Sequence, residues 1–263
     1  MPTIVPPSWS MARARSYVLR LPLLTRCFAA VIVLFWIVGL QGLFDVRAWG
    51  SLDPKEVGFG TLYRLNTFPF IHLNLFHAFF NILALTPLLE RFEMQNGTLT
   101  SVALFLGPFA TIPAALYLFV EKYIFWGSTA VMGASIWVFL LLGVEAIQTY
   151  KANPKFNIGS YFIPTWTTPL FLLLVIEALM PSSSFLGHIC GLVVGYAWGL
   201  GYIRFLAPPD KILRWIEGKL GLLERLPRYV SVDQKTYGRF GVLPSNGGGI
   251  PLRTVGGGQR LGP

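Results

Sequence analysis

The sequence predicts an all-α, polytopic membrane protein, and three observations support this fold class. The chain of 263 residues is 54% hydrophobic and only 13% charged, which is more apolar than an ordinary soluble domain. Six apolar runs each approach the ~20 residues that an α-helix needs to cross a bilayer. Basic residues precede the first run and follow the last, as is typical of cytosolic flanks. We therefore expect six transmembrane helices, with both termini in the cytosol.

The six predicted helices are joined mostly by short connections. Their ranges are 27–44, 72–89, 99–120, 130–147, 167–180 and 185–206. The fifth run is short, and we expect Ile163 and its neighbours to extend it. The first run could instead belong to a cleaved signal peptide. Its long basic leader, and the lack of a small-residue cleavage pattern after it, favour an uncleaved helix.

Three domains follow from this pattern: a cytosolic segment at 1–26, a six-helix domain at 27–206 and a cytosolic tail at 207–263. Residues 45–71 form a long luminal connection rich in aromatic side chains. In the tail, residues 210–226 repeat apolar side chains at helical spacing, which predicts an amphipathic helix on the membrane surface. The glycine-rich sequence from Pro227 onward predicts disorder.

The net charge and the cysteine content add little information about partners or compartment. The net charge of +9 is explained by basic flanks that meet anionic lipid, so a nucleic-acid partner is not expected. Cys27 and Cys190 both lie inside apolar runs, where a cysteine behaves as a small hydrophobic residue. The cysteines therefore predict no disulfide and indicate no compartment.

Polar side chains gather at one predicted depth of the membrane. In the expected topology the second, fourth and sixth helices all run from the outer side inward, so their early positions share the outer half of the bilayer. These positions hold His77, Asn81, Ser135 and His188. Each alone is compatible with a packing residue that bonds within its helix or to a neighbour. Together they predict a site, because polar groups inside a membrane are costly and usually functional.

Glycines recur at every fourth position of the sixth run, at Gly187, Gly191, Gly195 and Gly199. Small residues at this spacing allow a second helix to approach closely. Close approach would suit the short distance that a serine nucleophile requires to its base. A packing seam without chemistry fits the glycines equally well.

Four segments resemble motifs of the rhomboid family of intramembrane serine proteases. They are "YRLNTFPFIH", "HLNLFHAFFN", "GAS" at 133–135 and "GHICGLVVG", and the resemblance extends over residues 20–206. It implies that Ser135 is the nucleophile and His188 the base of a dyad that lacks a carboxylate. It also implies that His77 and Asn81 contribute to an oxyanion hole, that no cofactor or metal is needed, and that single-span membrane proteins are cut near the luminal face.

The sequence departs from the usual family pattern at four positions. Ile136 stands where glycine usually follows the serine, which puts access to the nucleophile in doubt. Phe139 replaces a tyrosine that packs on the catalytic histidine, and we expect Phe139, together with Gly191 and Gly195, to pack around His188. Tyr63 replaces a tryptophan but leaves Arg64 matched, and Gly187 replaces alanine. None of these changes removes a reacting group.

The last residues of the chain suggest a partner. Gly258, Gln259, Arg260, Leu261 and Gly262 resemble the short peptide with which cofactors bind valosin-containing protein, a hexameric AAA segregase. A disordered glycine-rich end is the simpler interpretation. With its six-helix core, this tail resembles that of the fungal Golgi rhomboids, which implies a multi-pass protein of the Golgi membrane.

Two alternatives to a protease remain open. One is a catalytically idle, derlin-like adaptor that delivers membrane clients to the segregase. Ile136 and the tail peptide are compatible with this interpretation. The presence of both Ser135 and His188 favours the protease. A small transporter is disfavoured, because no inverted repeat is evident and the polar residues lie in one leaflet.

Overall fold

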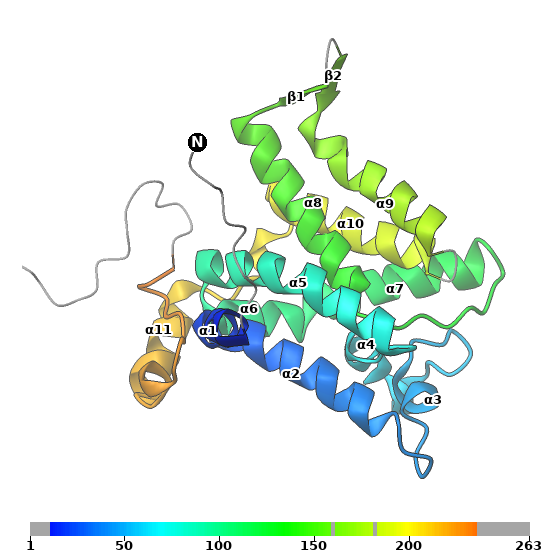
Figure 1. Cartoon of the computed structure of the whole chain (residues 1–263), viewed down its shortest axis with the longest axis horizontal. Helices are drawn as coiled ribbons and strands as arrows, with labels where there is room; N and C mark the ends of the chain where they lie inside the picture. Colours follow the sequence, from blue (N-terminus) through cyan, green and yellow to red (C-terminus); the bar gives the residue numbers. More distant parts are fainter. Residues whose placement is uncertain (1–10, 159–160, 181–182, 236–263) are drawn as a thin grey trace, which may run out of the picture.

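The computed structural model describes residues 11–158, 161–180 and 183–235, and these residues are mostly helical (Figure 1). The tail residues Gly258, Gln259, Arg260, Leu261 and Gly262 lie outside the described part. One short antiparallel hairpin pairs β1 with β2, with Phe156 opposite Ile163. The elements, in order, are α1 Met11–Arg20, α2 Leu23–Val38, α3 Val46–Gly50, α4 Arg64–Thr67, α5 Leu75–Asn96, α6 Thr98–Phe105, α7 Pro108–Tyr123, α8 Ser135–Ala152, β1 Lys155–Ile158, β2 Tyr161–Pro164, α9 Thr168–Leu179, α10 Phe185–Leu200 and α11 Asp210–Lys219.

Each of the six predicted runs coincides with helical structure, but the number of membrane crossings is not thereby fixed at six. Within the described residues, Thr98–Tyr123, which joins α6 to α7, is the one stretch long and apolar enough to cross a membrane unaided. Two bent pairs raise the number to three if each is a single span: Phe59–Phe70 with Leu75–Asn96, and Phe185–Leu200 with Arg204–Lys219. The count of six therefore remains a prediction.

The expected extension of the fifth run by Ile163 is wrong. Ile163 lies in strand β2, and α9 begins only at Thr168. Pro164 accounts for the difference, because the residue before a proline is driven out of the helical region into extended backbone. Among the described residues, the hairpin is the one exception to the predicted all-α fold.

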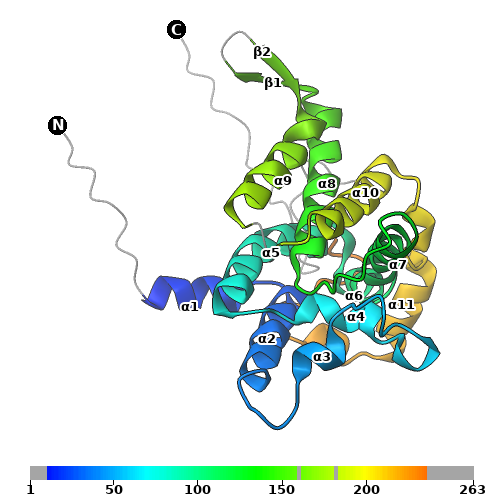
Figure 2. The ribbon, with the colours of Figure 1, turned by 90° about the vertical axis from the view of Figure 1, so that its right-hand side faces the viewer.

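Helix α8 lies in the middle of the bundle and contacts α5, α7, α9 and α10 (Figures 1 and 2). Trp137 of α8 is fully buried within a cluster of aromatic rings, and it stacks on Phe28 of α2 with ring centroids 5.1 Å apart. Phe70 and Phe105 meet the same indole edge-on. This packing fixes the position of α8, and with it the position of Ser135.

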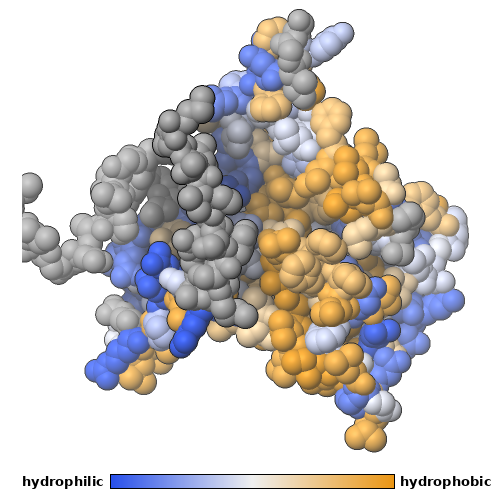
Figure 3. All heavy atoms as spheres, viewed as in Figure 1, coloured by the Kyte–Doolittle hydropathy of each residue, from blue (hydrophilic) through white to orange (hydrophobic). Residues whose placement is uncertain are grey.

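The outer surface of the bundle is strongly apolar. Large hydrophobic side chains of α2, α5 and α9 gather in a belt between more hydrophilic regions at the left and right of the view in Figure 3. Phe76, Leu83 and Leu174 are among them and are more than half exposed. Exposed apolar area of this extent marks a surface that meets lipid or protein rather than water.

The bundle end that carries the C-terminus of α5 is held by a buried carboxylate, Glu93. Its oxygens accept from the N–H groups of Leu24 and Thr25, both at 2.9 Å, and from the hydroxyl groups of Thr25 and Thr98 at 2.8 and 2.7 Å. Pro22 precedes α2 and supplies no capping side chain. Glu93 therefore satisfies free N–H groups at the start of α2, where negative charge is also favoured by the helix dipole.

We predicted disorder from Pro227 onward, and for residues 227–235 this is wrong. The backbone of Val230 pairs with Thr98: the Thr98 N–H donates to the Val230 carbonyl at 2.8 Å, and the Val230 N–H donates to the Thr98 hydroxyl at 2.9 Å. The buried carboxylate of Glu217 in α11 accepts from the Tyr229 hydroxyl at 2.7 Å. These contacts hold residues 227–235, here called the strap, against the core.

Candidate active site

The loop before α8 has a conformation that only its glycine tolerates easily. Gly133 has a φ of 114°, a region that side chains strongly disfavour. Backbone bonds anchor the loop: Leu52 and Val131 exchange two hydrogen bonds, and the Gly133 N–H donates to the Phe68 carbonyl at 2.9 Å. These bonds position Ser135 as the first residue of α8.

Ser135 offers both a hydroxyl and a free backbone N–H. Within the described residues, neither group makes a hydrogen bond, and the side chain is only half-buried. A free N–H at a helix N-terminus is available to stabilise negative charge. Ile136, the next residue, is buried and packs against Gly191 of α10. The effect of Ile136 on access to Ser135 stays a prediction.

His188 lies in the first turn of α10 and is 2% exposed. Its ring stacks on Phe139 of α8, with centroids 4.4 Å apart and planes inclined by 27°. Phe139 is one helical turn after Ser135, so this stacking brings His188 to the same end of α8 as the serine. The buried Nδ1 of His188 has no partner among the described residues.

Helices α8 and α10 run parallel and touch through glycines. A side chain at Gly191 would collide with the Ile136 carbonyl, and one at Gly195 would collide with the Leu140 carbonyl. These contacts align the start of α10 with the start of α8. In the described structure no hydrogen bond joins Ser135 to His188, and such bonds are commonly long in enzymes without substrate.

His77 and Asn81 reach the site from the first turns of α5. A Cβ at Gly133 would lie 2.6 Å from Cε1 of His77, so this ring packs directly on the loop that precedes Ser135. The Asn81 side chain is buried, and its amide nitrogen donates to the His77 carbonyl at 2.8 Å. The site thus gathers His77, Ser135 and His188, while Asn81 lies one turn further along α5.

We expect Asn81→Ala to weaken cleavage without abolishing it. One amide hydrogen of Asn81 is used within α5, which leaves the second for an oxyanion. Loss of one of several donors typically lowers kcat by ~10² to 10³. Initial cleavage rates of wild type and Asn81→Ala in one detergent would measure the effect, with Asn96→Ala, whose amide also bonds within α5, as the matched control. Wild-type turnover by Asn81→Ala would remove Asn81 from the oxyanion hole.

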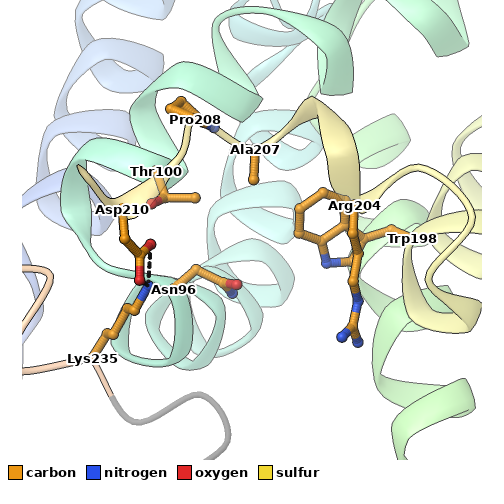
Figure 4. A pocket seen from close by; sticks show the side chains of 8 residues that line it. All are labelled: Asn96, Thr100, Trp198, Arg204, Ala207, Pro208, Asp210 and Lys235. Atoms are coloured by element: carbon orange, nitrogen blue, oxygen red, sulfur yellow. Dashed lines mark hydrogen bonds and ion pairs between the residues drawn. The ribbon is translucent and has the colours of Figure 1, made fainter. Parts of the chain in front are cut away.

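A cavity of about 160 Å³ lies at the other end of the bundle (Figure 4). Its walls come from the end of α5, the end of α10 and the start of α11. His77 and His188 lie at the opposite ends of α5 and α10. Lys235 of the strap closes one side through an ion pair with Asp210, at 2.7 and 2.8 Å. This cavity does not belong to the candidate active site. Its lining residues are Asn96, Thr100, Trp198, Arg204, Ala207, Pro208, Asp210 and Lys235.

The fold and the site together define the class of protein. An apolar exterior, a serine at a buried helix N-terminus and a neighbouring buried imidazole are features of a serine hydrolase embedded in a membrane. The Rhomboid domain family matches residues 60–205. The chain belongs to the rhomboid family and is a serine peptidase, an integral membrane protein that acts on membrane proteins within the bilayer.

Fungal relatives match nearly the whole chain. It is 63% identical to Rhomboid-type serine protease 2 of Neurospora crassa, over 97% of this chain and 95% of that protein. It is 60% identical to Rhomboid-type serine protease 2 of Podospora anserina, over 95% and 96% of the two chains. Rhomboid-type serine protease B of Aspergillus fumigatus is 57% identical, over 100% and 99%. These matches confirm the predicted family and the predicted enzyme class, whereas the assignment of individual catalytic residues stays a prediction.

Proposed function

We propose that this peptidase cuts single-span membrane proteins near the luminal face, with Ser135 as nucleophile and His188 as base. The observation that carries the proposal is the stacking of His188 on Phe139, one turn from Ser135, between helices that glycines hold in contact. This arrangement holds an imidazole at the end of α8 where Ser135 begins the helix. It supports a dyad without a carboxylate.

The proposed reaction begins when His188 accepts the proton of the Ser135 hydroxyl, and the serine oxygen attacks the substrate carbonyl. The imidazolium then formed faces the ring of Phe139, whose π-electrons favour a cation. It returns the proton to the leaving amine. Water entering from the luminal side then attacks the acyl-enzyme: His188 accepts a proton of the water and returns it to the Ser135 oxygen as the bond between that oxygen and the acyl group breaks.

The oxyanion would be stabilised by the Ser135 N–H together with side chains from α5. The Leu73 N–H points at Nδ1 of His77, at 3.4 Å, which favours the tautomer with its proton on Nε2. Nε2 of His77 is the nitrogen nearer to the space that a Cβ at Gly133 would occupy, at 2.8 Å. A neutral His77 therefore presents a donor towards the loop of Ser135.

The proposed topology has six spans, with both termini in the cytosol and the site on the luminal side. Backbone bonds support it: the Leu23 N–H at the start of α2 donates to the carbonyl of Arg228 in the strap, at 3.0 Å. The start of α2 and the strap therefore meet at one end of the bundle, and Ser135 lies at the start of α8, towards the other. A Golgi membrane is the proposed location, which protease protection of terminal tags and co-localisation in fungal cells would check.

The proposed activity is tested by mapping new termini. Wild type and Ser135→Ala would each be reconstituted with single-span proteins extracted from fungal Golgi membranes, and products identified by mass spectrometry. We expect fragments that arise only with wild type and that end within the luminal part of a transmembrane segment. Equal fragment sets from both proteins would refute the proposal, and cuts at the cytosolic border would refute the proposed orientation.

We also propose that the tail peptide, outside the described residues, binds the AAA segregase. A short peptide that orders on binding depends on few contacts, so Leu261→Ala should lose capture of the purified segregase. Deletion of 256–263 should do the same and leave cleavage in detergent unchanged, because the strap at 227–235 is retained. Capture that survives the deletion would refute the partner, and lost cleavage would show that the tail supports the fold.

A further inference from the structure

His72 lies beside the candidate site but has no part in the proposed reaction. It follows 3₁₀ turn Phe68–Phe70, just before α5, and its side chain is 4% exposed. Its ring meets that of His77 edge-on, with centroids 5.0 Å apart. A buried imidazole so close to a nucleophile requires an explanation.

Both ring nitrogens of His72 have backbone partners. Nδ1 lies 3.1 Å from the Phe70 carbonyl, and Nε2 lies 3.3 Å from the backbone nitrogen of Ala134. A carbonyl can only accept and an N–H can only donate, so Nδ1 carries the proton and Nε2 is the acceptor. The two bonds together fix the tautomer of His72 and join the loop before α5 to the loop before α8.

The bond to Ala134 has a consequence for the adjacent serine. Ala134 precedes α8, and its N–H is one of the donors that a helix start leaves without a partner. With this N–H held by His72, the peptide plane between Gly133 and Ala134 is fixed. The next N–H along the chain is that of Ser135, which stays free.

We propose that His72 is a positioning residue that holds the Ala134 N–H and so aims the Ser135 N–H at the oxyanion. This inference rests on the proposed function of Ser135. His77 packs on Gly133 and His72 bonds to Ala134, so the two histidines hold consecutive residues of the loop from the α5 side. His72 fixes the peptide plane before Ala134, and the bond from the Val138 N–H to the Ala134 carbonyl, at 3.0 Å, fixes the plane that carries the Ser135 N–H. The Ser135 N–H is then oriented before substrate arrives, which is the preorganisation that an oxyanion hole requires.

Three substitutions separate the two bonds. In His72→Gln the side-chain oxygen reaches the place of Nε2 and can accept from Ala134, but the donor to Phe70 is lost. In His72→Asn the amide reaches only the place of Nδ1, so the bond to Phe70 is kept and that to Ala134 is lost. His72→Phe keeps the ring and loses both bonds.

The test measures two rates on folded protein that has been purified by gel filtration in detergent. One is kcat and KM for a reporter identified by the terminus mapping, and the other is labelling of Ser135 by a fluorophosphonate, which needs no peptide substrate. We expect His72→Asn and His72→Phe to lower kcat and the labelling rate by ~10- to 10²-fold with KM unchanged, and His72→Gln to retain most of both rates. Gln148→Ala, in the last turns of α8, is the matched control.

The outcomes discriminate between explanations. Near wild-type rates in His72→Asn but not in His72→Gln would overturn the proposal, because the bond to Phe70 would then be the important one. Wild-type rates in all three variants would overturn it too, as would equal loss in all three with lowered thermal stability. If wild type itself is not labelled, or Ser135→Ala is, then the proposed function of Ser135 has failed, and that result is separate from any effect at His72.

Discussion

Ser135→Ala and His188→Ala are each expected to abolish cleavage, with a loss of ~10⁴-fold or more in kcat. Neither residue can act without the other. Ser135→Ala has no nucleophile, and without the His188 imidazole nothing accepts the serine proton. The double variant should therefore be no slower than either single variant. Cleavage of a reconstituted single-span substrate, together with the abundance of each variant in the membrane, gives the measurement.

Replacing His188 also removes a ring that stacks on Phe139, so a loss of activity could have a structural cause. His188→Phe provides the control, since it keeps an aromatic ring in the stack and removes the base. We expect His188→Phe to be inactive and to unfold near the wild-type temperature. Substantial turnover by Ser135→Ala, or by His188→Phe, would contradict the dyad.

The sequence predicted most helices because their apolar length is a local property. It could not predict where the helices are interrupted or shortened. Gly107 and Pro108 interrupt the third run, so that it becomes α6 and α7, and the fifth is shortened because Pro164 holds Ile163 extended. The length that a helix needs to cross a membrane identifies an apolar run in the sequence. It does not determine the residue at which the helix begins.

The strap and the Glu93 cap were missed for a different reason. Val230 is ordered by Thr98, which lies 132 positions earlier in the chain. The local composition around Val230 does not indicate such a bond, and the prediction of disorder rested on the glycines that follow. The partners of Glu93 are likewise distant in the chain, because they are backbone N–H groups at the start of α2.

At the candidate site, the side chains were easier to predict than their partners. The predicted topology places His77, Ser135 and His188 at one depth of the membrane, and in the structure these three residues lie at one site. The role of His72 was not predicted, because its partners are a backbone N–H and a carbonyl. Its place five residues before His77 was the available signal, but spacing cannot reveal a bond to a loop 62 residues away.

Side chains introduced at Gly195 should disable the enzyme by separating α10 from α8. Glycine inside a helix ordinarily destabilises it by ~1 kcal/mol relative to alanine, so an exposed site would gain stability from Gly→Ala. At Gly195 we expect the change from glycine to alanine to lower stability instead. The added Cβ would meet the Leu140 carbonyl oxygen and carbon, which are backbone atoms and cannot rotate away. We expect Gly195→Ala to lower the free energy of unfolding by ~1–3 kcal/mol and Gly195→Leu to lower it further.

The effect on cleavage should exceed the effect on stability, because His188 lies on the helix that would be displaced. A shift of about 1 Å at a reacting group can reduce the rate by ~10²-fold, so Gly195→Ala should already be slow while still folded. Val193→Leu adds bulk to an exposed position of α10 and serves as the matched control. Gly218→Ala in α11, where nothing lies within 4 Å of the added Cβ, controls for the glycine itself. Rates and thermal unfolding midpoints of the four variants would decide the matter: if Gly195→Leu matches Val193→Leu in both, the contact between α8 and α10 does not position the histidine.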